Sequence, residues 1–198
     1  MNLEMQALMN AFPNVKTLIE GSHVGGGNLE ELLEHWIENR KPICSAIEKP
    51  GTLLDIGCAN GFLLACLKFW SEYRITPYGV DIDTSSLELA RALLPEYANH
   101  FAQCSLEKLP TRTSLGLPRR FDYVYWNVWD GLDFVEPLYQ TYAENAFAAA
   151  RDGGRVILGF YNSDHEFVER QLEWLLGRFG AFTEKLEPGV VFVWWDQV

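Results

Sequence analysis

Two acidic residues, each at the end of an apolar run, are the side chains of this sequence best suited to binding chemistry. Asp55 follows Leu53 and Leu54, and Asp81 ends a second apolar run. Between them lie a glycine loop at residues 57–61 and an apolar helical segment. A strand, a glycine loop, a helix and a strand that ends in an acid form a mononucleotide-binding β-α-β unit. Asp81 is therefore expected to hydrogen-bond both hydroxyls of a ribose.

The charge of Asp55 narrows the choice of ligand. A dinucleotide needs free amides at a helix N-terminus for its pyrophosphate, and a carboxylate beside them would repel that anion. Asp55 stands just before the loop, where it would instead attract an ammonium or a sulfonium. A ribose at one end and a cationic amino acid at the other describe S-adenosylmethionine (SAM). The alternative role for Asp55 is an acid that caps the loop.

At this point the sequence resembles the class I SAM-dependent methyltransferases. Residues 55–61 resemble the first motif of that family, with Ala59 in place of its middle glycine, and residues 80–83 resemble the acidic strand end that follows. The resemblance covers about residues 51–198. It implies that the cofactor contacts Asp55, Gly57, Cys58, Ala59, Asn60, Gly61, Asp81, Ile82, Ser105, Leu106 and Asn127.

The sequence departs from the family pattern at two of these positions. Ser105 stands where an acid usually receives the adenine amino group, and a hydroxyl accepts that hydrogen bond less strongly. Asn127 is followed by Val128 and Trp129, without the prolines of some amino-group methyltransferases, so the motif does not predict nitrogen methylation. Ile82 packs on the adenine face or, alternatively, belongs to the core.

The substrate and any catalytic base are expected at the rim formed by the strand ends. Trp126, Trp129 and Tyr161 are candidates for lining a substrate pocket, although tryptophans more often belong to the core. Methyl transfer mainly requires alignment, and a base is needed only if the nucleophile must lose a proton. Asp164 and His165 are the nearest candidates, although both also suit the first turn of a helix. His23 is a further candidate, carried by the N-terminal segment.

The hydrophobic pattern predicts the elements that position these residues. The predicted fold is a Rossmann-like, doubly wound α/β sheet of seven strands with a C-terminal antiparallel hairpin and helices on both faces. Helices are predicted over residues 29–40, 61–72, 84–94, 137–150 and 163–179, with caps at Asn28, Thr84 and Ser163. Strands are predicted after residue 51 and over about 75–81, 99–103, 121–126, 155–160, 182–186 and 190–195.

The predicted organisation is one domain in two parts. Residues 51–198 form the methyltransferase core, and residues 1–50 form a helical segment on the substrate side. The glycine-rich stretch at residues 21–27 is either the hinge of a lid over the substrate or a plain connector.

Composition restricts the function further. The net charge of −11 over 198 residues argues against duplex DNA or structured RNA as a substrate. The four cysteines form no CxxC pair, which favours reduced thiols in the cytoplasm and no metal site. No membrane span or signal peptide is expected.

We therefore predict a SAM-dependent methyltransferase that acts on a small-molecule acceptor. One alternative is a SAM-binding regulatory or scaffold protein without catalysis. Another is a nicotinamide-dependent oxidoreductase, which Asp55 and the terminal hairpin disfavour. A protein acceptor also stays open, because an acidic surface attracts basic partners. The acceptor atom and the oligomeric state are not predicted.

Overall fold

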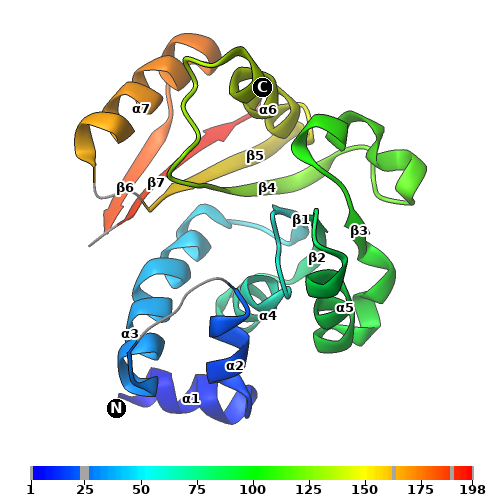
Figure 1. The fold of residues 1–198 in the computed structure, drawn as a ribbon, viewed down its shortest axis with the longest axis vertical. Coiled ribbons are helices and arrows are strands. Elements are labelled where there is room, and N and C mark those ends of the chain that lie inside the picture. The colour runs from blue at the N-terminus through cyan, green and yellow to red at the C-terminus, as the bar shows by residue number, and fades with distance from the viewer. Residues whose placement is uncertain (1, 23–26, 162–163, 188–189, 198) are drawn as a thin grey trace.

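The computed structural model describes residues 2–22, 27–161, 164–187 and 190–197 (Figure 1). Its strands are β1 (Gly51–Ile56), β2 (Ile75–Asp81), β3 (Phe101–Gln103), β4 (Phe121–Val128), β5 (Ala150–Phe160), β6 (Thr183–Glu187) and β7 (Val190–Asp196). They form one seven-stranded sheet in the order β3-β2-β1-β4-β5-β7-β6. The predicted fold class is confirmed.

Helices connect and cover these strands. The α-helices are α1 (Leu3–Ala11), α2 (Val15–Glu20), α3 (Leu29–Arg40), α4 (Phe62–Trp70), α5 (Thr84–Leu93), α6 (Pro137–Phe147) and α7 (His165–Phe179). The 3₁₀ segments are η1 (Lys41–Ala46), η2 (Pro95–His100) and η3 (Leu106–Leu115). Among the described helices, none is long and apolar enough to cross a membrane.

The pairing of the strands brings the predicted site residues to one edge. β1 lies between β2 and β4 and is parallel to both, so that Asp55 pairs with Gly79 on one side and with Tyr125 on the other. The carboxyl ends of these strands therefore meet at the same edge of the sheet, where α/β proteins bind their ligands. β7 runs antiparallel to β5 and β6, as predicted. Residues 188–189, where the sequence predicts the turn of the hairpin, lie outside the described part of the chain.

Each face of the sheet carries its own hydrophobic core. The N-terminal helices, α4 and α5 cover one face, and η3, α6 and α7 cover the other (Figure 1). Residues 1–50 share the first core with the β-α-β unit, since Trp36 of α3 stacks on Phe62 of α4 with ring centroids 5.1 Å apart. This packing sets the N-terminal segment beside the glycine loop.

Two predicted boundaries differ from the structure because of local capping. Asn28 and Glu31 form the predicted capping box at the start of α3. At α5, however, the cap is Asp83 rather than Thr84, because the Asp83 carboxylate accepts the amides of Ser85 and Ser86. At α7, Asp164 caps the helix, and Ser163 lies outside the described residues.

The alanine-rich segment before β5 is also shorter as a helix than predicted. α6 ends at Phe147 rather than at residue 150, and Ala150 already pairs with Phe121 of β4. Strand pairing outweighs the helix propensity of alanine here. β4 itself continues to Val128, two residues beyond its predicted end, which carries Asn127 to the rim.

Candidate active site

The glycine loop folds tightly around the end of β2. Gly57 and Gly61 have φ values of 78° and 72°, in the left-handed region that favours glycine. The amides of Gly57 and Cys58 both donate to the Val80 carbonyl, at 2.8 and 3.0 Å, and the Gly61 amide donates to the Cys58 carbonyl. These amides are therefore already used within the protein, whereas a bound phosphate would need them free.

Asp81 is part of the same hydrogen-bond arrangement. Its Oδ2 accepts the Ala59 amide at 2.8 Å, and its Oδ1 accepts the Asp83 amide at 2.9 Å. Each carboxylate oxygen has a second lone pair, so the half-buried group can still accept hydroxyls. Ile82, next to it, is 71% exposed and offers an apolar face at the same strand end. The predicted ribose and adenine residues thus lie together, with Asp81 fixed in position by the loop.

Asp55 is buried, and no described residue makes a hydrogen bond or ion pair with its carboxylate. The residue is 2% exposed, and its side chain lines a cavity beside the glycine loop. Burial raises the pKa of Asp55 to about 7, the nearby Asp81 charge adds to the rise, and the Arg40 charge opposes it. A buried carboxylate without a partner is costly, and a cation in the cavity would relieve that cost.

This cavity brings together residues from the loop, the sheet and the N-terminal segment. Its volume is about 40 Å³. It contains five predicted cofactor residues, namely Asp55, Gly57, Cys58, Ala59 and Asn127. It also contains five residues that the sequence analysis missed: Ser22, Trp36, Arg40, Leu63 and Tyr125.

The missed residues of α3 are held by aromatic rings. The Arg40 guanidinium carbon lies 3.8 Å from the centroid of the Tyr161 ring and 5.4 Å from that of Trp36. The Tyr161 hydroxyl donates to the Asn39 carbonyl at 3.1 Å and lies 2.9 Å from the Tyr125 hydroxyl. Tyr161, predicted to line a substrate pocket, therefore attaches the end of α3 to the sheet. The available sequence signal was the spacing of Trp36 and Arg40, which places them on one helix face.

Asn60 connects the glycine loop to the N-terminal segment. Its side chain is buried, and its Nδ2 donates to the Leu18 carbonyl at 2.8 Å. Its Oδ1 accepts the Ser22 hydroxyl at 2.7 Å and the Phe62 amide at 3.1 Å. Asn60 was predicted to contact the cofactor, but these partners give its side chain a bridging role.

The segment predicted to receive adenine follows β3. The Cys104 amide donates to the Asp81 carbonyl at 2.9 Å, which places the half-buried Ser105 close to the end of β2. Leu106 is buried, and its carbonyl accepts the Asn145 side chain at 2.9 Å. Ser105 and Leu106 thus lie beside the strand end that carries Asp81, although they do not line the small cavity.

Comparison with known proteins decides the family. A sequence profile described as a methyltransferase domain matches residues 54–158, more than half of the chain. The chain belongs to this methyltransferase family. It is a SAM-dependent enzyme, as the motifs predicted, and SAM is its cofactor.

Solved structures share the fold of this methyltransferase at low sequence identity. A SAM-dependent methyltransferase from Aquifex aeolicus is 16% identical, with a TM-score of 0.56 over 80% of this chain and 90% of that chain. An rRNA methylase from Streptococcus thermophilus is 15% identical, with a TM-score of 0.53 over 79% and 92%. Human methyltransferase-like protein 13, in complex with S-adenosylhomocysteine (SAH), is 17% identical, with a TM-score of 0.55 over 82% and 78%. No curated protein sequence matches the chain.

The two tryptophans near the end of β4 lie in different environments in the methyltransferase. Trp126 is fully buried in the core under α6 and α7, so its predicted place in a substrate pocket is wrong. The reason is strand alternation: Tyr125 faces the cavity, and its neighbour Trp126 faces the opposite side of the sheet. Trp129 is 49% exposed, with its ring centroid 6.0 Å from that of Trp126.

The predicted catalytic residues of the methyltransferase lie apart from the cavity. The Asp164 carboxylate accepts the Phe167 amide at 3.0 Å as the cap of α7, and His165 is exposed in the first turn. Neither residue lines the cavity. His23 lies outside the described residues. Within the described residues, no group of acids, cysteines and histidines could hold a metal ion.

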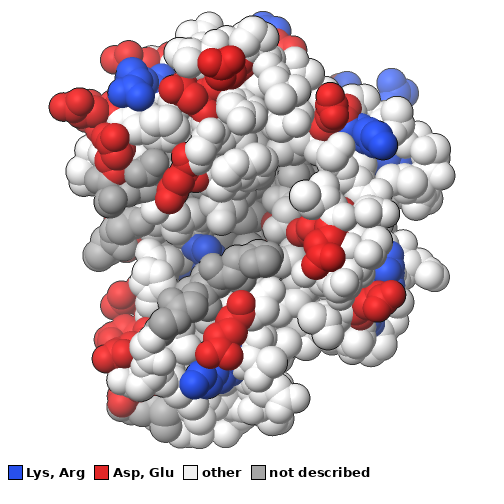
Figure 2. Space-filling view, viewed as in Figure 1, with Lys and Arg blue, Asp and Glu red and all other residues white. Residues whose placement is uncertain are grey.

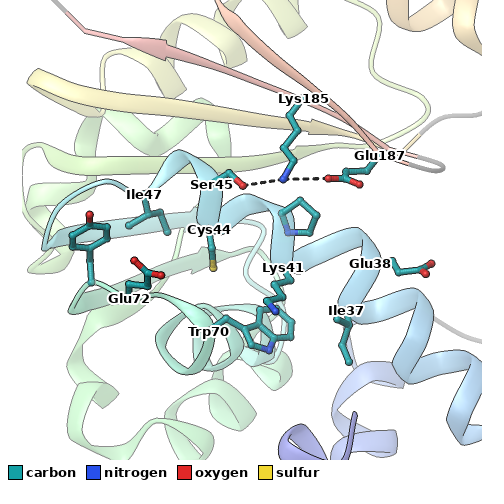
Figure 3. Close-up of a pocket in the computed structure, with 12 residues that line it drawn as sticks. Ile37, Glu38, Lys41, Cys44, Ser45, Ile47, Trp70, Glu72, Lys185 and Glu187 are labelled. Carbon is teal, nitrogen blue, oxygen red and sulfur yellow. Dashed lines mark hydrogen bonds and ion pairs between the residues drawn. The ribbon is translucent and has the colours of Figure 1, made fainter. Parts of the chain in front are cut away.

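A larger cavity, of about 670 Å³, lies between η1, the end of α4 and β6 (Figure 3). Three of its polar groups interact with one another, since the Lys185 ammonium donates to Ser45 at 2.9 Å and pairs with Glu187 at 3.1 Å. Burial raises the pKa of the Cys44 thiol to about 11, so the thiol stays protonated at neutral pH. None of its lining residues belongs to the glycine loop or to the strand ends that carry Asp55 and Asp81.

Proposed function

We propose that this methyltransferase transfers a methyl group from SAM to a small-molecule acceptor at the carboxyl end of β4. One observation carries the cofactor geometry. Asp55 is a buried carboxylate without a partner on a cavity where the amides of Gly57, Cys58 and Ala59 are already bonded. Such a cavity favours the ammonium end of an amino acid over a phosphate. Asp81 would then orient the ribose, with Ile82 against the adenine.

The chain's own residues would act by binding and alignment. When bound, SAM supplies a methyl group on a positively charged sulfur, already activated for transfer. Asn127 lines the cavity at the end of β4, and Trp129 is exposed just beyond it, so these two residues are candidates for holding the acceptor. Their task would be to place the acceptor atom in line with the reacting carbon.

Surface charge supports a neutral or cationic small molecule as the acceptor. The exposed faces of α3, which borders the cavity, and of α7 carry seven acids: Glu30, Glu31, Glu34 and Glu38 on α3, and Glu166, Glu169 and Glu173 on α7. Figure 2 shows acidic side chains grouped over these two helices on the left of the molecule. With a net charge of −11, the protein would repel a phosphate backbone.

The N-terminal segment is proposed as the part of the single domain that opens for the ligand. Sites that bury a ligand of this size have volumes of roughly 300–1,000 Å³. The cavity beside the loop has about 40 Å³, and Ser22, Trp36 and Arg40 close it from the N-terminal side. Movement of residues 1–50 would enlarge it. The predicted hinge at 21–27 falls largely outside the described residues. The proposal places the enzyme in the cytoplasm, where its cysteines would stay reduced.

Two measurements test this proposal. Calorimetric titration with SAM, SAH and NAD should give binding of the two sulfur compounds and none of NAD. Release of SAH is then followed with panels of small neutral acceptors, small amines, RNA and basic peptides. Turnover with a small molecule alone supports the proposal. Turnover with RNA or peptide alone would show that the acceptor belongs to that class instead of the small molecules. Binding of NAD alone would show that the cavity does not favour the ammonium end of an amino acid over a phosphate.

A further inference from the structure

The cavity beside the glycine loop holds two opposite charges that are not paired with each other. Among the described residues that line it, Asp55 is the one acid and Arg40 the one base. No ion pair joins them within the described structure, although Arg40 is close enough to oppose the rise in the pKa of Asp55. Two unpaired opposite charges facing one small space suit a ligand that carries both charges itself.

Arg40 is held so that its donors stay available. The ring of Tyr161 packs on its guanidinium at 3.8 Å, and Nη1 donates to the Asn39 carbonyl at 3.2 Å. A guanidinium has five N–H donors, and the contacts to the Asn39 carbonyl and to the Tyr161 side chain use only some of them. Donors therefore remain for a planar anion in the cavity. The contact between Tyr161 and Tyr125 fixes the stacking ring in turn.

We propose that Arg40 selects the amino-acid end of the cofactor by pairing with its carboxylate while Asp55 binds the ammonium of the same group. This inference rests on the proposed function, since it assigns a further residue of the same site. Arginine and a carboxylate form two parallel hydrogen bonds, which give both strength and orientation. Because Arg40 ends α3, the same contact would draw the N-terminal segment onto the bound cofactor.

A pair of ligands isolates this contact. SAH carries both charges, and its decarboxylated analogue keeps the ammonium, the ribose and the adenine. Calorimetric titration of the wild-type protein should show SAH binding about 10- to 100-fold more tightly, the effect of losing hydrogen bonds between charged groups. The comparison uses only the wild-type protein, so it does not depend on the folding of any variant. Equal binding of the two ligands would overturn the role of Arg40 and leave the proposed function standing.

Three variants locate the selectivity. Arg40→Met should bind the two ligands within about threefold of each other, and Arg40→Lys should keep part of the preference, because a lysine retains the charge without the planar fork. Lys41→Met is the matched control: it removes the adjacent positive charge, which does not line the cavity, and should keep the wild-type preference. If Arg40→Met weakens both ligands and preserves their ratio, Arg40 is only structural and the inference fails. If the wild-type protein binds neither ligand, the proposed function fails and this inference with it.

Discussion

The cavity beside β1 has two walls that are built in different ways. The glycine loop is held by its backbone amides, which donate to the end of β2: those of Gly57 and Cys58 to the Val80 carbonyl, and that of Ala59 to the Asp81 carboxylate. The end of α3 is held by side chains distant in sequence, above all Tyr161, whose hydroxyl contacts the carbonyl of Asn39. One wall is encoded within a single β-α-β unit, and the other depends on the tertiary fold.

This difference predicts different behaviour of the two walls. A loop bonded through its own main chain keeps its shape when the cavity is empty. The other wall, formed by the N-terminal segment, is held by the rings stacked at the end of α3 and by the hydrogen bonds of Asn60 with Leu18 and Ser22. This N-terminal wall can therefore separate from the glycine loop without disturbing the sheet. We therefore expect substitutions in the loop wall to weaken cofactor binding directly. In the N-terminal wall we expect them to affect closure, apart from Arg40, which is proposed to contact the cofactor itself.

The largest effect is expected at Asp81. Asp81→Ala removes the ribose acceptor and also leaves the Ala59 amide without its partner, so SAM and SAH should bind about 10-fold more weakly or worse. Titration calorimetry measures the loss, and circular dichroism checks the fold. Asp81→Asn keeps one carbonyl oxygen and should lose less. An unchanged affinity in folded Asp81→Ala would remove this residue from the site.

Asp55 should give the next largest effect, and one that depends on pH. With a pKa of about 7 in the folded protein, its carboxyl must lose a proton before it can pair with an ammonium. Affinity for SAH should therefore fall as the pH is lowered below 7, approaching about tenfold per pH unit. Asp55→Asn should bind weakly at all pH values, without this slope. Glu173→Gln, which changes an exposed acid on α7, should keep the wild-type profile.

The raised pKa of Asp55 also predicts the direction in which stability changes with pH. Its pKa rises from an ordinary 3.8 in the unfolded chain to about 7 in the folded protein. Between these values the folded state holds the extra proton, so the contribution of Asp55 to stability decreases as the pH rises through this window. Chemical denaturation gives the free energy of unfolding at pH 5 and at pH 8. The difference between these two free energies should be smaller for Asp55→Asn than for the wild-type protein. An equal difference would contradict the raised pKa.

A smaller effect is expected where the two walls meet. Asn60→Ala leaves the Phe62 amide without its partner and removes one of the two side-chain donors to the Leu18 carbonyl, so it should lower the free energy of unfolding by about 2 kcal/mol. Ser22→Ala removes one hydroxyl donor, which is shared between Asn60 Oδ1 and the Leu18 carbonyl, and should cost about 1 kcal/mol. In both variants, amide hydrogen exchange should rise in α2 and stay unchanged in β1. Equal increases in α2 and β1 would show that the walls do not separate.

Sequence reasoning found the first wall and missed most of the second, for a physical reason. The loop residues can be recognised in the sequence because a left-handed turn favours glycine, and because Asp55 and Asp81 end apolar strands within one short segment. The strand alternation that turns Trp126 away from the cavity was also present in the sequence, once the limits of β4 are known.

Arg40 and Ser22 carry no comparable signal. A helix of acids, leucines and one tryptophan predicts α3 correctly, but it does not say over which part of the sheet its last turn will lie. That position is set by Tyr125 of β4 and by Tyr161, which directly follows β5, and both lie far along the chain. Asn60 shows the same limit of sequence reasoning. The motif predicts its place in the loop, but nothing in the sequence indicates that its side chain bonds to Leu18 of α2.

The smallest effects are expected at the start of α7, which belongs to neither wall. Asp164→Ala removes a helix cap and should lower the free energy of unfolding by about 1 kcal/mol without changing the affinity for SAH. His165→Ala should change neither quantity, and turnover on the acceptor should stay within about twofold, because the exposed ring lies outside the cavity. A large loss of turnover in His165→Ala, with SAH affinity intact, would restore this histidine as the base. It would also mean that the start of α7 forms a third wall when the acceptor binds.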